Sequence, residues 1–129
     1  MRRPGQRRRA TGSIVLRGEI RLVDLDPARG NEVDKRRPAI LVSNDRANLT
    51  AARLGRGVVT VVPVTSNTDR ILAFQALLPA SDTGLRLDSK AQAEQVRSVS
   101  VERIGPLLGR ASAEVLSAVD DALRLHLDL

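Results

Sequence analysis

The sequence predicts a mainly β domain that ends in one helix. Short apolar runs rich in β-branched residues recur along residues 19–101, separated by Gly, Pro, Asn and Asp, and Val58–Val64 is the clearest of them. Helical spacing of apolar residues appears clearly only near the C-terminus. Several short strands followed by a single helix are typical of a small, strongly bent sheet. We therefore expect an SH3-like small β-barrel of five to seven short strands with a C-terminal helix.

The first part of the chain predicts two strands and a helix. Alternation of apolar and polar residues predicts a strand over Glu19–Leu25, and the nearly all-apolar run Ala39–Ser43 predicts a strand buried on both faces. A short helix is expected over Arg46–Arg53, where Asn44 or Asp45 can cap the N-terminus.

The middle of the chain predicts further strands. Pro63 lies inside the strongest strand signal, Val58–Val64, and this predicts an edge position or a bulge near the end of that strand. The elements expected next are a strand, a turn and two strands, over Ala73–Leu78, Ser81–Gly84, Leu85–Ala91 and Gln95–Val101.

The C-terminal helix is predicted by an apolar stripe, with Ser112 as its N-cap. The stripe consists of Val115, Leu116, Val119, Ala122, Leu123 and His126. His126 is the single histidine of the chain, and its place on this stripe favours a packed or interface residue over a catalyst. A nuclease mechanism that uses two histidines of one chain is therefore excluded.

The composition is that of one globular domain with a basic N-terminal tail. The formal net charge is +6, but five arginines lie within residues 1–13; without them, 16 of the 21 basic residues remain against 15 acidic ones. We expect residues 1–16 to form a disordered tail and residues 17–129 to form the domain. With neither a signal peptide nor an apolar run that could span a bilayer, the expected location is the cytoplasm.

Several kinds of chemistry are excluded by the residue inventory. The chain has no cysteine, which removes thiolate nucleophiles and cysteine zinc sites. The carboxylates have no spacing typical of a metal site, so we expect no metal and no cofactor. One Phe and no Tyr or Trp leave almost no aromatic surface for stacking bases.

A polar loop over Pro27–Pro38 lies between the first two expected strands. It carries a carboxylate at Glu32 and three consecutive cations, of which Arg37 directly precedes Pro38. The proline pushes Arg37 towards extended geometry, and a guanidinium can bind a phosphate through two hydrogen bonds. Glu32 could accept a proton, and the hydroxyl of Thr65 at the end of the best strand could bind a phosphate oxygen. A solvated loop with incidental charges is the alternative.

Four separated motifs resemble the MazF/PemK toxin family in order and spacing. They are Arg17–Glu32, Arg36–Asp45, Val62–Asn67 and Lys90–Ser98, and the resemblance runs from about residue 17 to residue 129. It implies an SH3-like barrel that acts as a homodimer, cuts single-stranded RNA at short motifs without a metal, and leaves 2′,3′-cyclic phosphate and 5′-hydroxyl ends. A MazE-type antitoxin is the implied protein partner.

The resemblance also implies site residues. The catalytic arginine and threonine of the family fall on Arg37 and Thr65, and its acidic loop residue falls on Glu32. The RNA-binding residues expected beside them are Asn31, Lys35, Arg36, Ser66, Asn67, Glu94 and Gln95. Val33 departs from the Gln that is frequent in the family, so base preference cannot be transferred from relatives. The sequence leaves open which residue acts as acid and which as base.

Two other functions remain compatible with the same barrel. One is a CcdB-like protein-binding toxin that poisons gyrase, for which Arg37 and Thr65 would be dispensable. The other is a noncatalytic RNA-binding barrel, for which a nearly neutral domain without aromatic residues is poorly equipped. Incubation with RNA in the presence of EDTA, followed by mapping of the RNA ends, separates the three.

Overall fold

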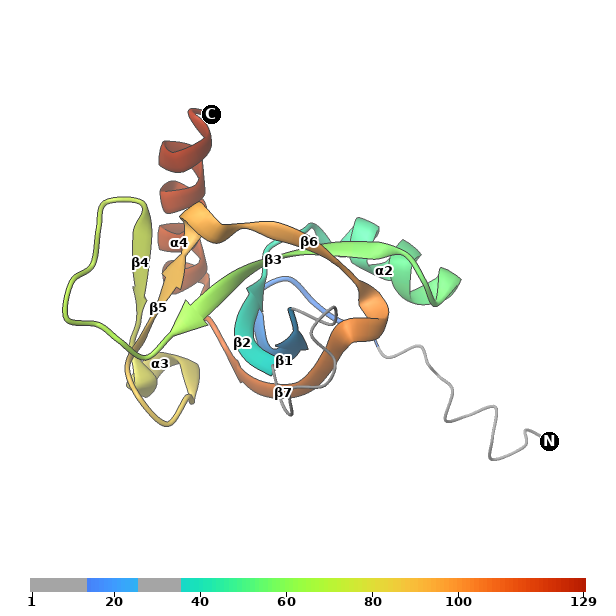
Figure 1. Ribbon diagram of the computed structural model, residues 1–129, viewed down its shortest axis with the longest axis horizontal. Helices are drawn as coiled ribbons and strands as arrows, with labels where there is room; N and C mark the ends of the chain where they lie inside the picture. The colour runs from blue at the N-terminus through green and yellow to red at the C-terminus, as the bar shows by residue number, and fades with distance from the viewer. Residues whose placement is uncertain (1–13, 26–35) are drawn as a thin grey trace.

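The computed structural model describes residues 14–25 and 36–129, and in this part the chain forms a seven-stranded antiparallel sheet with helices packed on it (Figure 1). The strands are β1 (Glu19–Asp24), β2 (Arg36–Leu41), β3 (Val58–Thr65), β4 (Gln75–Leu78), β5 (Ser89–Gln92), β6 (Arg97–Ser100) and β7 (Ile104–Arg110). The helices are α2 (Asp45–Leu54), α3 (Ala80–Thr83) and α4 (Ala113–Leu127), with 3₁₀ helices η3 (Ala93–Gln95) and η4 (Val101–Arg103).

Strand β3 is the centre of the sheet, whose order is β4-β5-β3-β2-β1-β7, with β6 also paired to β3. On one side β3 pairs with β2; on the other it pairs with β6 as far as Val61 and with β5 from Val64. Pro63 lies where the partner changes from β6 to β5. The expectation of an edge strand or bulge is therefore wrong. A residue without an N–H is tolerated here because neither β6 nor β5 is paired with residue 63.

The core forms on both faces of the central strands. Alternate residues of β3 belong to two apolar clusters: Val59 and Val61 pack in one, and Val62 and Val64 in the other. Helix α2 contributes Ala51 to the first cluster, and α4 contributes Val119 to the second. The two helices lie well apart in Figure 1, α2 beside the start of β3 and α4 beside β4 and β5.

The helix caps agree with the sequence. The Asn44 side chain accepts a hydrogen bond from the Ala47 N–H at 2.8 Å and begins α2, and Ser112 accepts one from the Val115 N–H at 3.2 Å and begins α4. The C-terminal helix is confirmed. Helices in the described part of the chain are too short or too polar to cross a membrane.

Strand β7 was not predicted, because Gly105, Pro106 and Gly109 interrupt its apolar pattern. The glycines are required by close packing. A Cβ atom at Gly105 would lie 2.7 Å from the Leu22 carbonyl oxygen, and one at Gly109 would lie 2.5 Å from the Thr83 carbonyl oxygen. The glycines that interrupt the strand pattern in the sequence are therefore the residues that let β7 approach β1 and α3. The register of β7 against β1 is irregular.

Several predicted boundaries also differ from the structure. Ser81–Gly84 overlaps the short helix α3 rather than a simple turn, and the strand expected over Leu85–Ala91 begins only at Ser89. The strand expected over Ala73–Leu78 begins at Gln75, and Gln95–Val101 is divided among η3, β6 and η4. In these segments apolar and polar residues alternate over only two or three positions, which is too few to define where a strand begins.

The packed part of the chain begins before residue 17. Val15, inside the expected tail, is 2% exposed and belongs to the first core cluster. Arg17 donates a hydrogen bond to the Val42 carbonyl at 2.6 Å and forms an ion pair with Asp120, which ties the start of the domain to α4. Strands β6 and β7 follow one another through η4, and the described pairings do not join them, so closure into an SH3-like barrel stays a prediction.

Glu94 is partly buried, and its side chain bonds to a residue of β4. Its carboxylate accepts a hydrogen bond from the Gln75 side-chain amide at 2.8 Å, and its other oxygen is buried. Gln75 is 8% exposed, and its own amide oxygen accepts a bond from the Leu72 N–H at 2.9 Å. The pair therefore links η3, β4 and the loop before β4.

We expect Glu94→Ala to lower the free energy of unfolding by about 1–3 kcal/mol, because the buried Gln75 amide loses its acceptor. Urea unfolding measures the loss. Glu94→Gln is the control, since it retains an oxygen acceptor and should lose less than half as much. An alanine variant as stable as the parent would show that the Gln75 bond contributes nothing to folding.

Candidate functional site

The pairing of β2 with β3 brings Arg37 and Thr65 to the same place. Ala39 is paired with Pro63, and continuing this antiparallel register by two residues sets Arg37 opposite Thr65. The strands have separated at that point, since the pairing of β2 with β3 ends at Ala39 and Pro63. Each strand keeps its other neighbour there: Arg37 is paired with Val23 of β1, and Thr65 with Lys90 of β5. The two side chains therefore lie on either side of an opening between β2 and β3.

One pocket at this opening, of about 580 Å³, is predominantly polar, and we call it the polar pocket. Its lining consists of Leu25, Arg37, Pro63, Val64, Thr65, Gln92, Gln95 and Arg97. Strands β2, β3 and β6 contribute Arg37, Thr65 and Arg97, and the segment from β5 through η3 contributes the two amides. Guanidinium, hydroxyl and amide groups are those that proteins use to bind phosphates and base edges.

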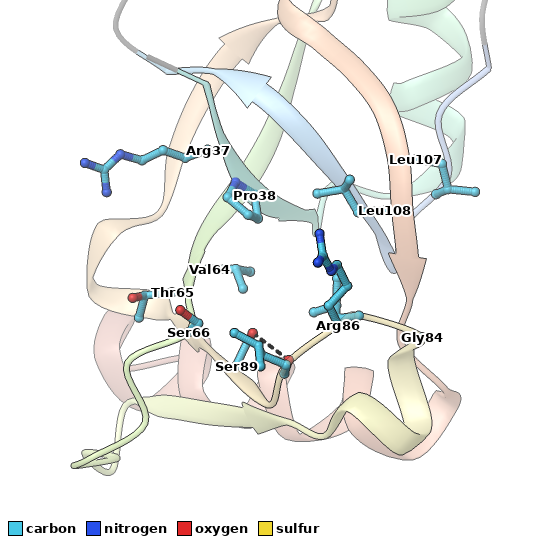
Figure 2. Close-up of a pocket in the computed structure, with 12 residues that line it drawn as sticks. Arg37, Pro38, Val64, Thr65, Ser66, Gly84, Arg86, Ser89, Leu107 and Leu108 are labelled. Carbon is cyan, nitrogen blue, oxygen red and sulfur yellow. Dashed lines mark hydrogen bonds between the residues drawn. The ribbon is translucent and has the colours of Figure 1, made fainter. Parts of the chain in front are cut away.

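A second pocket, of about 520 Å³, is predominantly apolar, and we call it the apolar pocket. Its lining consists of Arg37, Pro38, Val64, Thr65, Ser66, Gly84, Leu85, Arg86, Leu87, Ser89, Leu107 and Leu108 (Figure 2). Arg37, Val64 and Thr65 line both pockets. In Figure 2 the Arg37 side chain points away from the apolar pocket, while Pro38 and Val64 face it.

The Arg37 guanidinium is exposed, and in the described part of the chain it makes neither a hydrogen bond nor an ion pair. A cation in this state binds an anion without first breaking an internal ion pair. The Thr65 hydroxyl oxygen accepts a bond from the Asn67 N–H at 3.2 Å. Because that bond uses the oxygen as acceptor, the hydroxyl hydrogen remains available to donate to a ligand.

The 3₁₀ helix η3 decides which side chains of its motif reach the polar pocket. Residues three apart lie on the same side of a 3₁₀ helix, so Gln92 and Gln95 face the pocket together. Glu94, one residue away, turns towards Gln75 and lines neither pocket.

The structure brings together three of the residues predicted from sequence, Arg37, Thr65 and Gln95, in the polar pocket, and adds Ser66 in the apolar pocket. Arg36 and Asn67 are exposed nearby and line neither pocket. The predicted residues Asn31, Glu32 and Lys35 lie outside the described residues. The RNA-binding role of Glu94 stays a prediction, and its bond to Gln75 gives it a structural one.

Among the pocket residues with a charged or amide side chain, three were missed from sequence: Gln92, Arg97 and Arg86. The first two lie in the motif Lys90–Ser98, where their spacing from Gln95 could have indicated a shared face. Arg86 gave no such signal, because the segment around it was expected to be a strand. His126 is exposed, lines neither pocket, and has its ring 6.1 Å from the ring of Phe74.

The chemistry offered by the site is that of anion binding. Within residues 14–25 and 36–129 no three His, Cys, Asp or Glu side chains are grouped as a metal site would need. Arg37 and Arg97 can neutralise charge on a phosphate, while the Thr65 hydroxyl and the amides of Gln92 and Gln95 supply neutral hydrogen bonds.

Solved structures with the same fold include MazF from Deinococcus radiodurans, with a TM-score of 0.68 and 27% identity over 91% of this chain and 99% of that one. A mycobacterial endoribonuclease solved in complex with its cognate antitoxin gives a TM-score of 0.69 at 23% identity, covering 89% of this chain and 96% of that one. At that identity the second likeness supports the fold alone.

The sequence comparisons also cover nearly the whole chain. It is 63% identical over 116 residues to Endoribonuclease MazF9 of Mycobacterium tuberculosis, covering 90% of this chain and 98% of the relative. Endoribonuclease EndoA of Bacillus subtilis is 27% identical over 117 residues, covering 90% of this chain and 97% of the relative. The family described as PemK-like, MazF-like toxin of type II toxin–antitoxin systems matches residues 16–127. The chain therefore belongs to the MazF/PemK family of toxins.

Proposed function

We propose that this chain is a toxin endoribonuclease that cuts single-stranded RNA at short sequence motifs, without a metal, and leaves 2′,3′-cyclic phosphate and 5′-hydroxyl ends. Family membership and 63% identity to an endoribonuclease support the activity itself. The single structural observation that supports the chemistry is the meeting of Arg37 and Thr65 at one opening that two pockets share.

The proposed reaction is an internal transesterification. The ribose 2′-oxygen forms a bond to the adjacent phosphorus, and the bond from phosphorus to the 5′-oxygen of the next nucleotide breaks. A base removes the 2′-hydroxyl proton, and the leaving 5′-oxygen receives a proton. Charge therefore builds on the non-bridging phosphate oxygens before the 5′-oxygen leaves, and this charge is what the site must stabilise.

Arg37 and Thr65 suit that task. A guanidinium can form two parallel bonds to phosphate oxygens, and its positive charge opposes the negative charge that develops on them. The Thr65 hydroxyl, its oxygen fixed by the Asn67 N–H, donates to a third position on the same phosphate. Glu32 is proposed as the base that accepts the 2′-proton.

The partners belong to the same proposal. An antitoxin of the MazE type would neutralise the toxin by placing an acidic or amphipathic segment over Arg36 and Arg37, whose charges attract anions. Membership of a family of type II toxin–antitoxin toxins supports this partner. A homodimer of closed SH3-like barrels completes the proposed assembly.

End mapping tests the function. We expect the purified protein to cut a mixed-sequence RNA in the presence of EDTA and to leave ends that are 2′,3′-cyclic phosphates and 5′-hydroxyls. Cleavage that disappears with EDTA would contradict the metal-free route. Intact RNA together with inhibition of a topoisomerase would favour a CcdB-like toxin, and binding without cleavage would favour a noncatalytic RNA-binding barrel.

Replacing Arg37 by Ala should lower kcat by about 100- to 1,000-fold, the usual effect of losing one group that stabilises developing charge. Single-turnover cleavage of a defined RNA measures the change. Arg53→Ala is the matched control, because it removes the same charge from the exposed last turn of α2 and lines neither pocket. Equal rates for the two variants would remove Arg37 from the reaction.

Replacing Thr65 by Val keeps the shape of the side chain and removes its hydroxyl. We expect cleavage to slow by about 10- to 150-fold, the value of one hydrogen bond to a charged group. Thr65→Ser should retain most of the parental rate, since serine can accept from the Asn67 N–H and donate to phosphate. A serine variant as slow as the valine variant would indicate that the methyl group, rather than the hydroxyl, matters.

A further inference from the structure

The polar and apolar pockets lie on opposite faces of the sheet. Pro38 lines only the apolar pocket and Pro63 only the polar one. Pro63 is paired with Ala39 and shares its face, whereas the side chain of Pro38, one residue earlier in β2, points to the other face. The pockets therefore meet only where β2 and β3 separate, along Arg37, Val64 and Thr65.

An RNA strand bound with one phosphate between Arg37 and Thr65 has a pocket on each side of that phosphate. The volumes, about 580 and 520 Å³, both lie in the range of about 300–1,000 Å³ that is usual for small-ligand sites. Each is thus of a size to receive the base of a nucleotide that flanks the phosphate.

The polar pocket is equipped to read a base by hydrogen bonds. Gln92 and Gln95 each present an amide donor and an acceptor, and their position on one side of η3 lets both face the same ligand. An amide can bond two adjacent atoms on a base edge, and a guanidinium such as that of Arg97 can do the same on guanine. Bases that lack the matching atoms leave these groups unpaired.

The apolar pocket has no such set of groups. Its walls carry Leu87, Leu107 and Leu108, which are 63%, 43% and 37% exposed, and Arg86 lies on the same side of the pocket as Leu108 (Figure 2). A base can pack its face against leucine side chains and under a guanidinium plane without an aromatic partner. Such packing favours a size and shape of base and reads little of its edge.

We propose that the nucleotides on the two sides of the scissile phosphate enter different pockets: the base in the polar pocket is selected by hydrogen bonds from Gln92 and Gln95, and the base in the apolar pocket by packing against Leu87 and Arg86. This inference rests on the proposed ribonuclease function and adds to it the means of sequence selection. The base, rather than a protein segment, is assigned to the apolar pocket because its wall includes Arg37 and Thr65, between which the phosphate is proposed to lie. The Arg37 guanidinium points away from this pocket, and Arg86 supplies the cation on the apolar side, which suits a phosphate-linked ligand.

The test is the base profile around the cut in a randomised RNA, read from the mapped ends for the parent, Gln95→Ala and Leu87→Ser. Gln95→Ala should reduce base discrimination about tenfold or more at one position beside the cut bond. Leu87→Ser should raise KM several-fold and alter the profile at the position on the other side of that bond, leaving the Gln95-dependent position unchanged. Leu54→Ser is the matched control, because Leu54 is 62% exposed and lines neither pocket.

Several results would overturn the inference. One is a change at the same position for both variants; another is a Leu87→Ser profile identical to that of Leu54→Ser. A change of oligomeric state in Leu87→Ser alone, measured by sedimentation, would show that a second copy of the chain covers the apolar pocket. These outcomes leave the ribonuclease intact, since the parent still cuts and Arg37→Ala still fails. A parent protein that does not cut would end both proposals.

Discussion

The site depends on the antiparallel register of β2 and β3. This register fixes Ala39 opposite Pro63 and so aligns Arg37 with Thr65, although 27 residues of sequence separate them. A shift of one residue would turn the guanidinium to the other face of the sheet. The register is held by the core itself, because Ile40, Leu41, Val61 and Val62 are fully buried on the two faces of the same pair.

The separation of the two strands is as important as their pairing. A continuous ladder through Arg37 and Thr65 would leave no room for a ligand between them. Instead, Arg37 remains paired to β1, while β3 changes partner from β6 to β5 around Pro63. The proline removes a backbone donor at a position that is paired with β2 but with neither β6 nor β5. The change of partner along β3 thus creates the opening beside Thr65. The amides of the polar pocket come from the end of β5 and from the 3₁₀ helix η3 that follows it.

Charge and composition explain how such a chain can act on RNA. The net charge of +6 comes mostly from the N-terminal arginines, and the rest of the chain is nearly neutral. Phosphate affinity within the domain must therefore come from a few well-placed arginines rather than from a broad basic surface. The near absence of aromatic residues has a similar consequence: bases must be held by amides, leucines and guanidinium planes instead of by stacking on rings.

The sequence by itself determined the class of fold, the C-terminal helix with its Ser112 cap, and the motifs that contain Arg37, Thr65 and Gln95. These features rest on local patterns: β-branched runs, helical spacing, capping side chains and short ordered motifs. For the cap of α2 the sequence offered Asn44 or Asp45, and the structure decided for Asn44. The sequence could not determine β7, since the need for glycine at residues 105 and 109 arises from the backbone of distant residues, Leu22 and Thr83. Nor could it separate Gln95 from Glu94: only η3 and the partner Gln75 decide that Gln95 faces the polar pocket while the Glu94 side chain turns to Gln75. The tertiary structure alone decided that Pro63 marks a change of strand partner and that Arg97 and Arg86 reach the site, because long-range strand pairing, and not local preference, sets which side chains meet.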